Sequence, residues 1–182
     1  ESTRPSYAHR AGLHHEPVTI FTPFAGREAV LDRYIAAIRN LECDPSLIRL
    51  HWFDTSGKPA FADRLKREMA TLPFARVTYT AWRLPQLWDQ TPQKLIDNRV
   101  SGKQHARHYY QMAVVALYNH FIASCDTELG FTIEDDVIPE PKTLTSLLNA
   151  FEEDVVATVA SYPCRFRNCQ IFCFDNGFCC SL

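Results

Sequence analysis

Hydrophobic residues follow two spacings along the chain, and each spacing predicts one type of secondary structure. Short runs rich in β-branched and aromatic residues predict strands, and they lie at 18–22, 48–53, 76–81, 129–133 and 155–160. Between these runs, apolar residues recur every three or four positions, which predicts helices with one buried face. The stripes run from Leu31 to Leu41, Phe61 to Leu72, Tyr110 to Phe121 and Leu144 to Phe151.

The alternation of strands and helices predicts an α/β fold, a Rossmann-like three-layer sandwich with a mainly parallel sheet. Consecutive parallel strands need crossover connections, and the helices that supply them cover both faces of the sheet. We expect the strands that begin near Val18, Ile48, Arg76 and Leu129 to be neighbours.

Length and charge limit the classes of partner. A chain of 182 residues is expected to form one main domain. The net charge of -2 gives no attraction to nucleic acid. No apolar run approaches the roughly 18 residues that a membrane-spanning helix needs. We therefore expect no nucleic acid partner and no transmembrane segment.

The composition also changes along the chain. Residues 1–16 are polar and carry no apolar signal region, so we expect a flexible lead-in to a folded domain at 17–163. Residues 164–182 form a tail with five of the seven cysteines. These cysteines contain no C-x-x-C pair, which disfavours a zinc site, and the odd total argues against a complete disulfide framework. A reduced, cytoplasmic chain is the expectation.

Three loops directly follow predicted strands and carry the polar residues of interest, at 23–27, 54–57 and 134–136. In open parallel sheets, ligands bind beyond the carboxyl ends of the strands, so these loops are expected to share one site. The sequence has neither G-x-G-x-x-G nor G-x-x-x-x-G-K-[ST], which counts against a dinucleotide-binding domain and a P-loop NTPase.

The loop after the fourth strand consists of Glu134, Asp135 and Asp136. Three adjacent carboxylates repel one another, and a divalent cation is the usual group that offsets this repulsion. The alternative is a solvated acidic turn.

Taken in order, these segments resemble the nucleotide-sugar-binding half of a GT-A glycosyltransferase of the family-2-like group. Thr22–Arg27 resembles the strand-then-P-x-x-x-R opening, and Phe53–Gly57 resembles the D-D-G-S end of the second strand. Gly102–Arg107 resembles the stretch that opens the helix before the metal motif. Glu134-Asp135-Asp136 resembles an E-D-D form of the DxD signature.

The resemblance implies metal-dependent transfer of a sugar from a UDP- or GDP-sugar donor to an unknown acceptor. It implies that Mn²⁺ or Mg²⁺ binds Asp136 directly and Glu134 through water, or that Glu134 contacts the ribose. The residues it implies for donor binding are Pro23, Arg27, Asp54, Lys103, Arg107 and Asp135. The resemblance stops near Ala160, so we expect a truncated GT-A fold whose catalytic base is unknown.

Other interpretations stay open. Asp54 is equally typical of an N-cap or Asx-turn, and Arg27 is equally placed to pair with Glu28. Lys103 and Arg107 also fit a solvated basic turn. At the level of the whole chain, the alternatives are a truncated or degenerate nucleotide-binding domain without catalysis, and a nucleotidyltransferase. The single glycine of the first loop disfavours the latter, because triphosphate-binding loops are usually rich in glycine.

Overall fold

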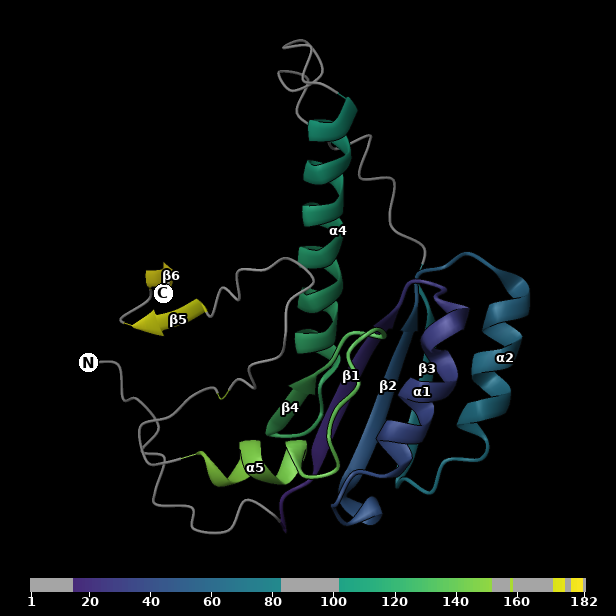
Figure 1. Ribbon diagram of the computed structural model, residues 1–182, viewed down its shortest axis with the longest axis vertical. Coiled ribbons are helices and arrows are strands. Elements are labelled where there is room, and N and C mark those ends of the chain that lie inside the picture. The colour runs from purple at the N-terminus through teal and green to yellow at the C-terminus, as the bar shows by residue number, and fades with distance from the viewer. Residues whose placement is uncertain (1–14, 83–101, 152–157, 159–171, 176–177, 182) are drawn as a thin grey trace. The chain divides into compact units, whose positions relative to one another are not determined.

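The computed structural model describes residues 15–82, 102–151, 158, 172–175 and 178–181 (Figure 1). The side chains at 102–112, 172–175 and 178–181 lie outside this description. Residue contacts divide the chain into two units, which are treated separately here. One unit is His15–Lys142, and the other combines Glu1–His14 with Thr143–Leu182. The domain boundaries expected from the sequence stay predictions.

The first unit is built on a sheet of four parallel strands in the order β3-β2-β1-β4. Val18 pairs with Ile48 and Leu129, which begin the two strands on either side of β1. The expected α/β class and the four neighbouring strands are confirmed. Of the predicted strand at 155–160, the structure describes only Thr158, so this prediction lies almost wholly outside the described residues. The strand bounds are β1 (Val18–Phe24), β2 (Ile48–Asp54), β3 (Arg76–Ala81) and β4 (Leu129–Thr132).

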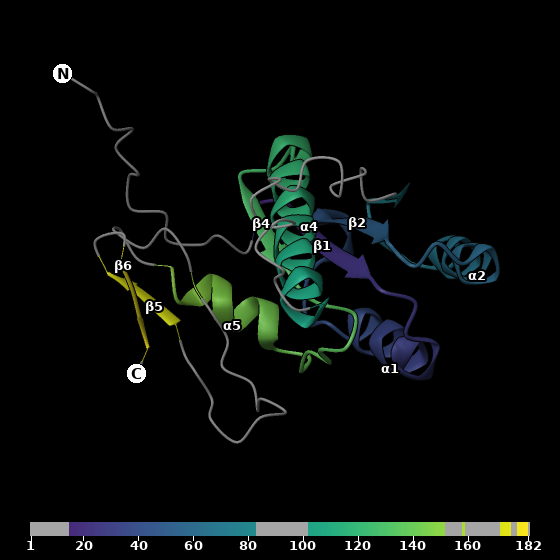
Figure 2. The same cartoon turned by 90° about the horizontal axis from the view of Figure 1, so that it is seen from above.

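Helices connect these strands and cover the sheet on both sides. A short 3-10 turn, η2 (Pro45–Leu47), leads into β2. In Figures 1 and 2, β1 and β2 lie between α4 on one side and α1 and α2 on the other. The helices are α1 (Glu28–Arg39), α2 (Pro59–Met69) and α4 (Gly102–Ser124).

One face of the sheet packs against α1 and α2. Alternate strand residues point to opposite faces, and on this face the Phe24 ring lies 5.0 Å from Trp52 of β2. It also lies 5.4 Å from Tyr34 of α1 and 6.2 Å from Phe61 of α2. All four side chains are fully buried. Burying each large side chain contributes about 1.5–3 kcal/mol, so this layer is a main source of stability.

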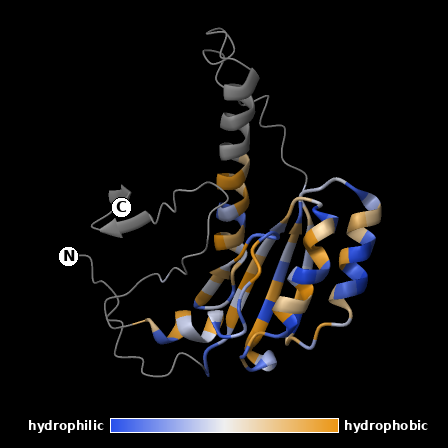
Figure 3. Cartoon of the chain, viewed as in Figure 1, coloured by the Kyte–Doolittle hydropathy of each residue, from blue (hydrophilic) through white to orange (hydrophobic). Residues whose placement is uncertain are grey.

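The opposite face packs against α4. Phe21 stacks on Phe121 with ring centroids 4.5 Å apart, and Phe53 and Leu117 complete this buried cluster. Because β1 contributes Phe24 to one layer and Phe21 to the other, the unit is a three-layer sandwich, as the sequence predicts. Figure 3 shows hydrophobic and hydrophilic positions alternating along the strands and along α1 and α2, and hydrophobic positions on the described turns of α4.

The second unit contains α5 (Thr143–Asn149), on which Leu144 and Leu148 are buried. The Thr158 hydroxyl donates a hydrogen bond to the Leu147 carbonyl, 3.2 Å away. Within the cysteine-rich tail, β5 (Phe172–Asp175) and β6 (Phe178–Ser181) pair antiparallel. Among the residues that the structure describes, no helix has the length and apolar character needed to cross a membrane.

Candidate functional site

The carboxyl ends of β1 and β4 mark the point where the chain reverses its direction across the sheet. From β1, the chain first adds β2 and β3 on one side, and it later adds β4 on the other side. The connection from β1 to β2 contains α1, whereas the connection from β3 to β4 contains α4, and these two helices cover opposite faces of the sheet. In open α/β sheets this switch point is where ligands bind. The sequence places Ala25–Arg27 after β1 and Glu134–Asp136 after β4.

Asp135 joins these two loops. Its Oδ2 accepts a hydrogen bond from the Ala25 N–H at 2.9 Å, and its Oδ1 accepts one from the Arg27 guanidinium. The residue is only 3% exposed. Burial raises the pKa of Asp135, while the Ala25 N–H and Arg27 act in the opposite direction. Asp135 is thus a buried carboxylate that fixes the switch point.

Arg27 lies at the N-terminal end of α1 and contacts a second carboxylate. Its Nη1 is 3.0 Å from Oδ2 of Asp136, and the Arg27 side chain is 40% exposed. Partial burial lowers the pKa of Arg27, but the charges of Asp135 and Asp136 outweigh this and raise it. The Arg27 guanidinium therefore contacts the acidic turn, whereas the sequence also allowed a pair with Glu28.

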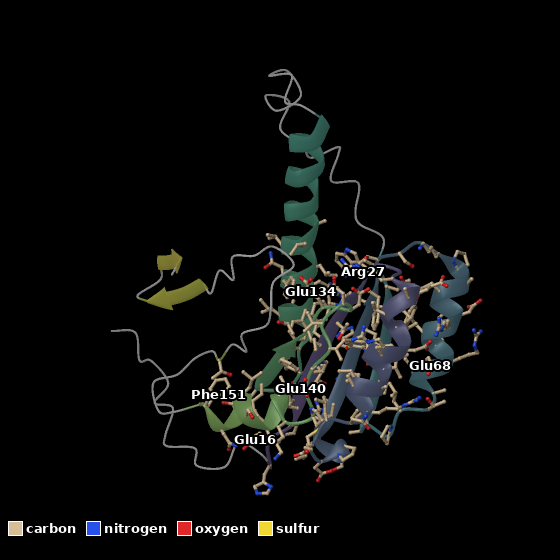
Figure 4. All side chains as sticks on the ribbon, in the orientation of Figure 1. Glu16, Arg27, Glu68, Glu134, Glu140 and Phe151 are labelled. Atoms are coloured by element: carbon tan, nitrogen blue, oxygen red, sulfur yellow. The ribbon has the colours of Figure 1, made fainter. Side chains whose placement is uncertain are left out.

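Glu134 and Asp136 flank the buried Asp135 in a turn. This turn is closed by a hydrogen bond of 3.1 Å from the Val137 N–H to the Glu134 carbonyl. Glu134 is exposed, and the Asp136 side chain is 15% exposed. The pKa of Glu134 is raised, because the Glu134 carboxyl loses hydration and lies near the negative charge of Asp136. Figure 4 shows Glu134 and Arg27 at the same end of the sheet.

The loops after β1 and β2 are packed closely against each other. Gly26 has a positive φ of 78°, and a Cβ atom there would lie 2.7 Å from Cβ of Ser56. The Lys58 ammonium donates to the Gly26 carbonyl at 3.2 Å. Glycine is the residue that adopts this positive φ readily and leaves room for the Ser56 side chain. Lys58, which the sequence did not single out, thereby adds a cation at the Gly26 carbonyl, in the loop that precedes α1.

Asp54 ends β2, and each of its carboxylate oxygens has a partner. Oδ1 accepts from the Ser56 N–H at 2.8 Å, and Oδ2 accepts from the Tyr79 hydroxyl at 2.9 Å. The residue is 5% exposed. Burial and the contact with Asp54 raise the pKa of Tyr79 to about 12. The bond to Ser56 is the Asx-turn that the sequence left open, and contact with a nucleobase stays a proposal.

The structure brings most of the selected residues to one edge of the sheet. Pro23 is half-buried on β1 opposite Phe53, next to the Phe24–Asp54 pair. Lys103 and Arg107 lie in the first turns of α4, and their side chains are outside the described residues. Tyr79 was missed because its role depends on the pairing of β3 with β2. Lys58 had a local signal, a lysine directly after the Ser56-Gly57 loop.

The carboxylates of the acidic turn fit a divalent cation that is also bound by the phosphate oxygens of a nucleotide. Among the described residues, no group of three or more His, Cys, Asp and Glu side chains is placed to hold a metal by itself. Asp136 and Glu134 offer two carboxylates, and Mg²⁺ is commonly bound by one or two carboxylates together with substrate phosphates and water. The donor set therefore suits Mg²⁺ or Mn²⁺ when phosphate oxygens complete the shell.

Comparison with solved structures places the fold beside that of a glycosyltransferase. The chain is similar to the mannosyltransferase PcManGT from Pyrobaculum calidifontis in complex with GDP-Man and Mn2+, with a TM-score of 0.52 and 12% identity. The match covers 80% of this chain and 35% of that chain. At this identity, the likeness concerns the fold.

A second structure, S. aureus TarS 1-349, gives a TM-score of 0.45 at 9% identity over 73% of this chain and 31% of that chain. This weaker likeness adds no argument. No protein-family model and no curated protein sequence match the chain. The chain thus spans about a third of each of these two solved structures.

Proposed function

We propose that this chain binds a nucleoside diphosphate sugar, with Mn²⁺ or Mg²⁺, at the switch point of its sheet. It would form the donor-binding part of a GT-A glycosyltransferase of the family-2-like group, with an acceptor that is not identified. The observation that carries the proposal is the Arg27–Asp135–Asp136 contact, in which a buried carboxylate and a cation hold an acidic turn at the ligand-binding edge. The fold likeness to a mannosyltransferase supports it.

Asp136 and Glu134 are the proposed metal-binding residues. A divalent metal, when bound, neutralises charge on the diphosphate leaving group. Asp136 would bind the metal directly, and Glu134 would act through water or contact the ribose. Asp135 is buried against Ala25 and Arg27, so its proposed role is to hold the turn and to position the cation that faces the donor.

The remaining donor contacts come from residues on neighbouring elements. Pro23 and Arg27 would border the donor from the end of β1, and Asp54 would meet the nucleobase from the end of β2. Lys103 and Arg107 would meet the diphosphate at the start of α4, where free backbone N–H groups also favour anions. Lys58 adds a further positive charge at the Gly26 carbonyl.

Calorimetry tests this proposal directly. Wild-type protein is titrated with UDP and with GDP, each with and without Mn²⁺. We expect one of the two nucleotides to bind in a Mn²⁺-dependent manner. Asp136→Ala should abolish this dependence, and Glu134→Ala should weaken it less. Absence of binding by both nucleotides in the presence of Mn²⁺ would contradict the proposal.

Asp126→Ala is the matched control, because Asp126 is an aspartate paired with arginines, Arg49 and Arg76, and precedes β4 at the opposite end of the strands. Its nucleotide binding should equal that of the wild type. Once a nucleotide is identified, a hydrolysis screen over sugars carried by that nucleotide tests turnover. Binding without hydrolysis would favour a nucleotide-binding domain that lacks catalysis.

A further inference from the structure

Arg27 is a cation that lies against the acidic turn. Its guanidinium contacts Oδ1 of Asp135 and lies 3.0 Å from Oδ2 of Asp136. These two contacts are not equivalent. Asp135 is buried and is also held by the Ala25 N–H, whereas Asp136 has a more accessible side chain. The contact with Asp135 is therefore the anchor, and the contact with Asp136 is the one that can be exchanged.

A divalent cation at Asp136 would compete with Arg27 for the same carboxylate. The metal and the guanidinium are both positive, so they repel each other when both lie against Asp136. A diphosphate has the opposite effect, because it attracts the guanidinium. Arg27 carries five N–H donors in a planar fork, so it can keep one bond to Asp135 while it directs others to an anion.

We propose that Arg27 exchanges partners when the donor binds. Without ligand, it occupies Asp136 and lowers the affinity of the site for a metal alone. With a nucleoside diphosphate, it keeps Asp135, releases Asp136 to the metal and donates to the diphosphate. Arg27 thus makes metal and nucleotide binding depend on each other. This inference rests on the proposed function and assigns Arg27 as a donor-binding residue that couples metal and nucleotide at that same site.

Binding linkage turns this exchange into a measurable pattern. If nucleotide raises the affinity for metal by some factor, metal raises the affinity for nucleotide by the same factor. In the wild type, we expect GDP or UDP to increase Mn²⁺ affinity by on the order of tenfold. In Arg27→Gln, Mn²⁺ alone should bind about tenfold more tightly, because the competing charge is gone. The enhancement by nucleotide should then become smaller, because only the direct contact between phosphate and metal remains to couple the two ligands.

The experiment is a Mn²⁺ titration followed by electron paramagnetic resonance of the free ion, with and without GDP or UDP. The variants are Arg27→Gln, Arg27→Lys and the control Arg64→Gln. Arg64 also pairs with an aspartate, Asp32, but on the exposed surface formed by α1 and α2. The control should match the wild type in both titrations. Circular dichroism checks that each variant is folded.

The two substitutions at Arg27 keep the test decisive. Lysine preserves the charge without the planar fork, so Mn²⁺ alone should bind as in the wild type while the enhancement by nucleotide becomes smaller. If glutamine prevents folding, the lysine variant decides the question, and an unchanged enhancement in it overturns the proposal. Equal weakening of both titrations in Arg27→Gln, or no change in either, also overturns it. Wild-type protein that binds no Mn²⁺ in either titration refutes the proposed function itself.

Discussion

The two ends of the sheet each join aspartate to arginine, but with opposite electrostatic results. Near the amino ends of β2 and β3, Asp126 lies 3.0 Å from Arg49 and 2.6 Å from Arg76, and all three side chains are exposed or partly exposed. The hydrogen bond from Arg76 lowers the pKa of Asp126. At the carboxyl ends, Asp135 also accepts from an arginine, yet its pKa is raised because it is buried.

Burial is the difference, and it indicates which end has a role beyond stability. An exposed pair stays hydrated and contributes little to folding. A buried charge loses its hydration, and attraction within the pair seldom repays that loss. Perturbed carboxylates of this kind gather at functional sites. The comparison therefore favours the carboxyl ends for ligand binding and assigns Asp126 to the surface.

The largest expected effect comes from removing the buried carboxylate. Asp135→Ala leaves the Ala25 N–H and the Arg27 guanidinium without this acceptor. We expect a loss of about 2–3 kcal/mol in the free energy of unfolding, the upper part of the range for hydrogen bonds that involve charged groups. Urea denaturation measures it. Asp126→Ala is the matched control and should change the stability far less. Equal losses in the two variants would show that the aspartate–arginine contacts at the carboxyl and amino ends of the strands contribute equally to stability.

A pair of glycine substitutions tests how tightly the carboxyl end is built. Gly26→Ala places a Cβ atom 2.7 Å from Ser56 at a φ of +78°, and we expect a loss of about 2 kcal/mol from the backbone and the close contact together. Gly57→Ala shares the positive φ but has no atom within 4 Å of the new Cβ. Its loss should be about 1 kcal/mol. Thermal unfolding of both variants gives the difference. Equal losses would mean that the loops after β1 and β2 can move apart to accommodate the added Cβ atom at little cost.

Much of the frame could be predicted from the sequence because its signals are local. The β-rich runs at 18–22 and 48–53 predict β1 and β2, although β1 continues through Pro23 to Phe24 and β2 to Asp54. Parallel pairing then brings the carboxyl ends of the strands to one edge. The Asx-turn of Asp54 involves a residue only two positions away, so it was also accessible to sequence reasoning. These features need no knowledge of how distant loops meet.

The contacts that define the site could not be predicted in the same way. Arg27 and Asp135 are 108 positions apart, and their contact depends on how two loops leave the sheet. The bond from Tyr79 to Asp54 depends on the register that places Tyr79 opposite Trp52. Motif spacing selected Arg27 and Asp135 separately, but it did not indicate that one binds the other.

A smaller effect is expected at the end of β2. Tyr79→Phe removes one hydrogen bond to Asp54 while the bond from the Ser56 N–H remains. We expect a loss of about 1.5 kcal/mol in the free energy of unfolding, the lower end of the range for a hydrogen bond to a charged group, because the bond from Ser56 remains. Chemical denaturation measures it. A loss as large as that of Asp135→Ala would show that the hydrogen bonds of Asp54 and Asp135 contribute equally to stability. Burial would then not distinguish the switch point from the end of β2.

The smallest effect concerns pH, at a histidine between the two ends. The His51 ring lies 4.3 Å from Phe53, and its Nε2 lies 3.2 Å from the Thr80 hydroxyl. Burial, followed by the charges of His120 and Arg76, lowers the pKa of His51 from 6.5 to about 4, while Asp126 acts in the opposite direction.

Between these two pH values the unfolded chain binds the proton more readily than the folded chain does. The stability that depends on neutral His51 is therefore complete above pH 6.5 and is lost as the pH falls toward 4. His51→Gln should flatten this part of the curve of unfolding free energy against pH. An unchanged slope in the variant would assign the pH dependence to other groups.

The most direct test of the account is where Mn²⁺ binds on the sheet. Mn²⁺ broadens the NMR signals of nearby nuclei, so amide spectra recorded with GDP or UDP report its position. The account predicts that the amides of Gly26, Arg27 and Asp136 lose intensity first, while those of Arg49, Arg76 and Asp126 keep theirs. Broadening centred on Asp126, or spread evenly over the chain, would contradict a metal and nucleotide site at the switch point.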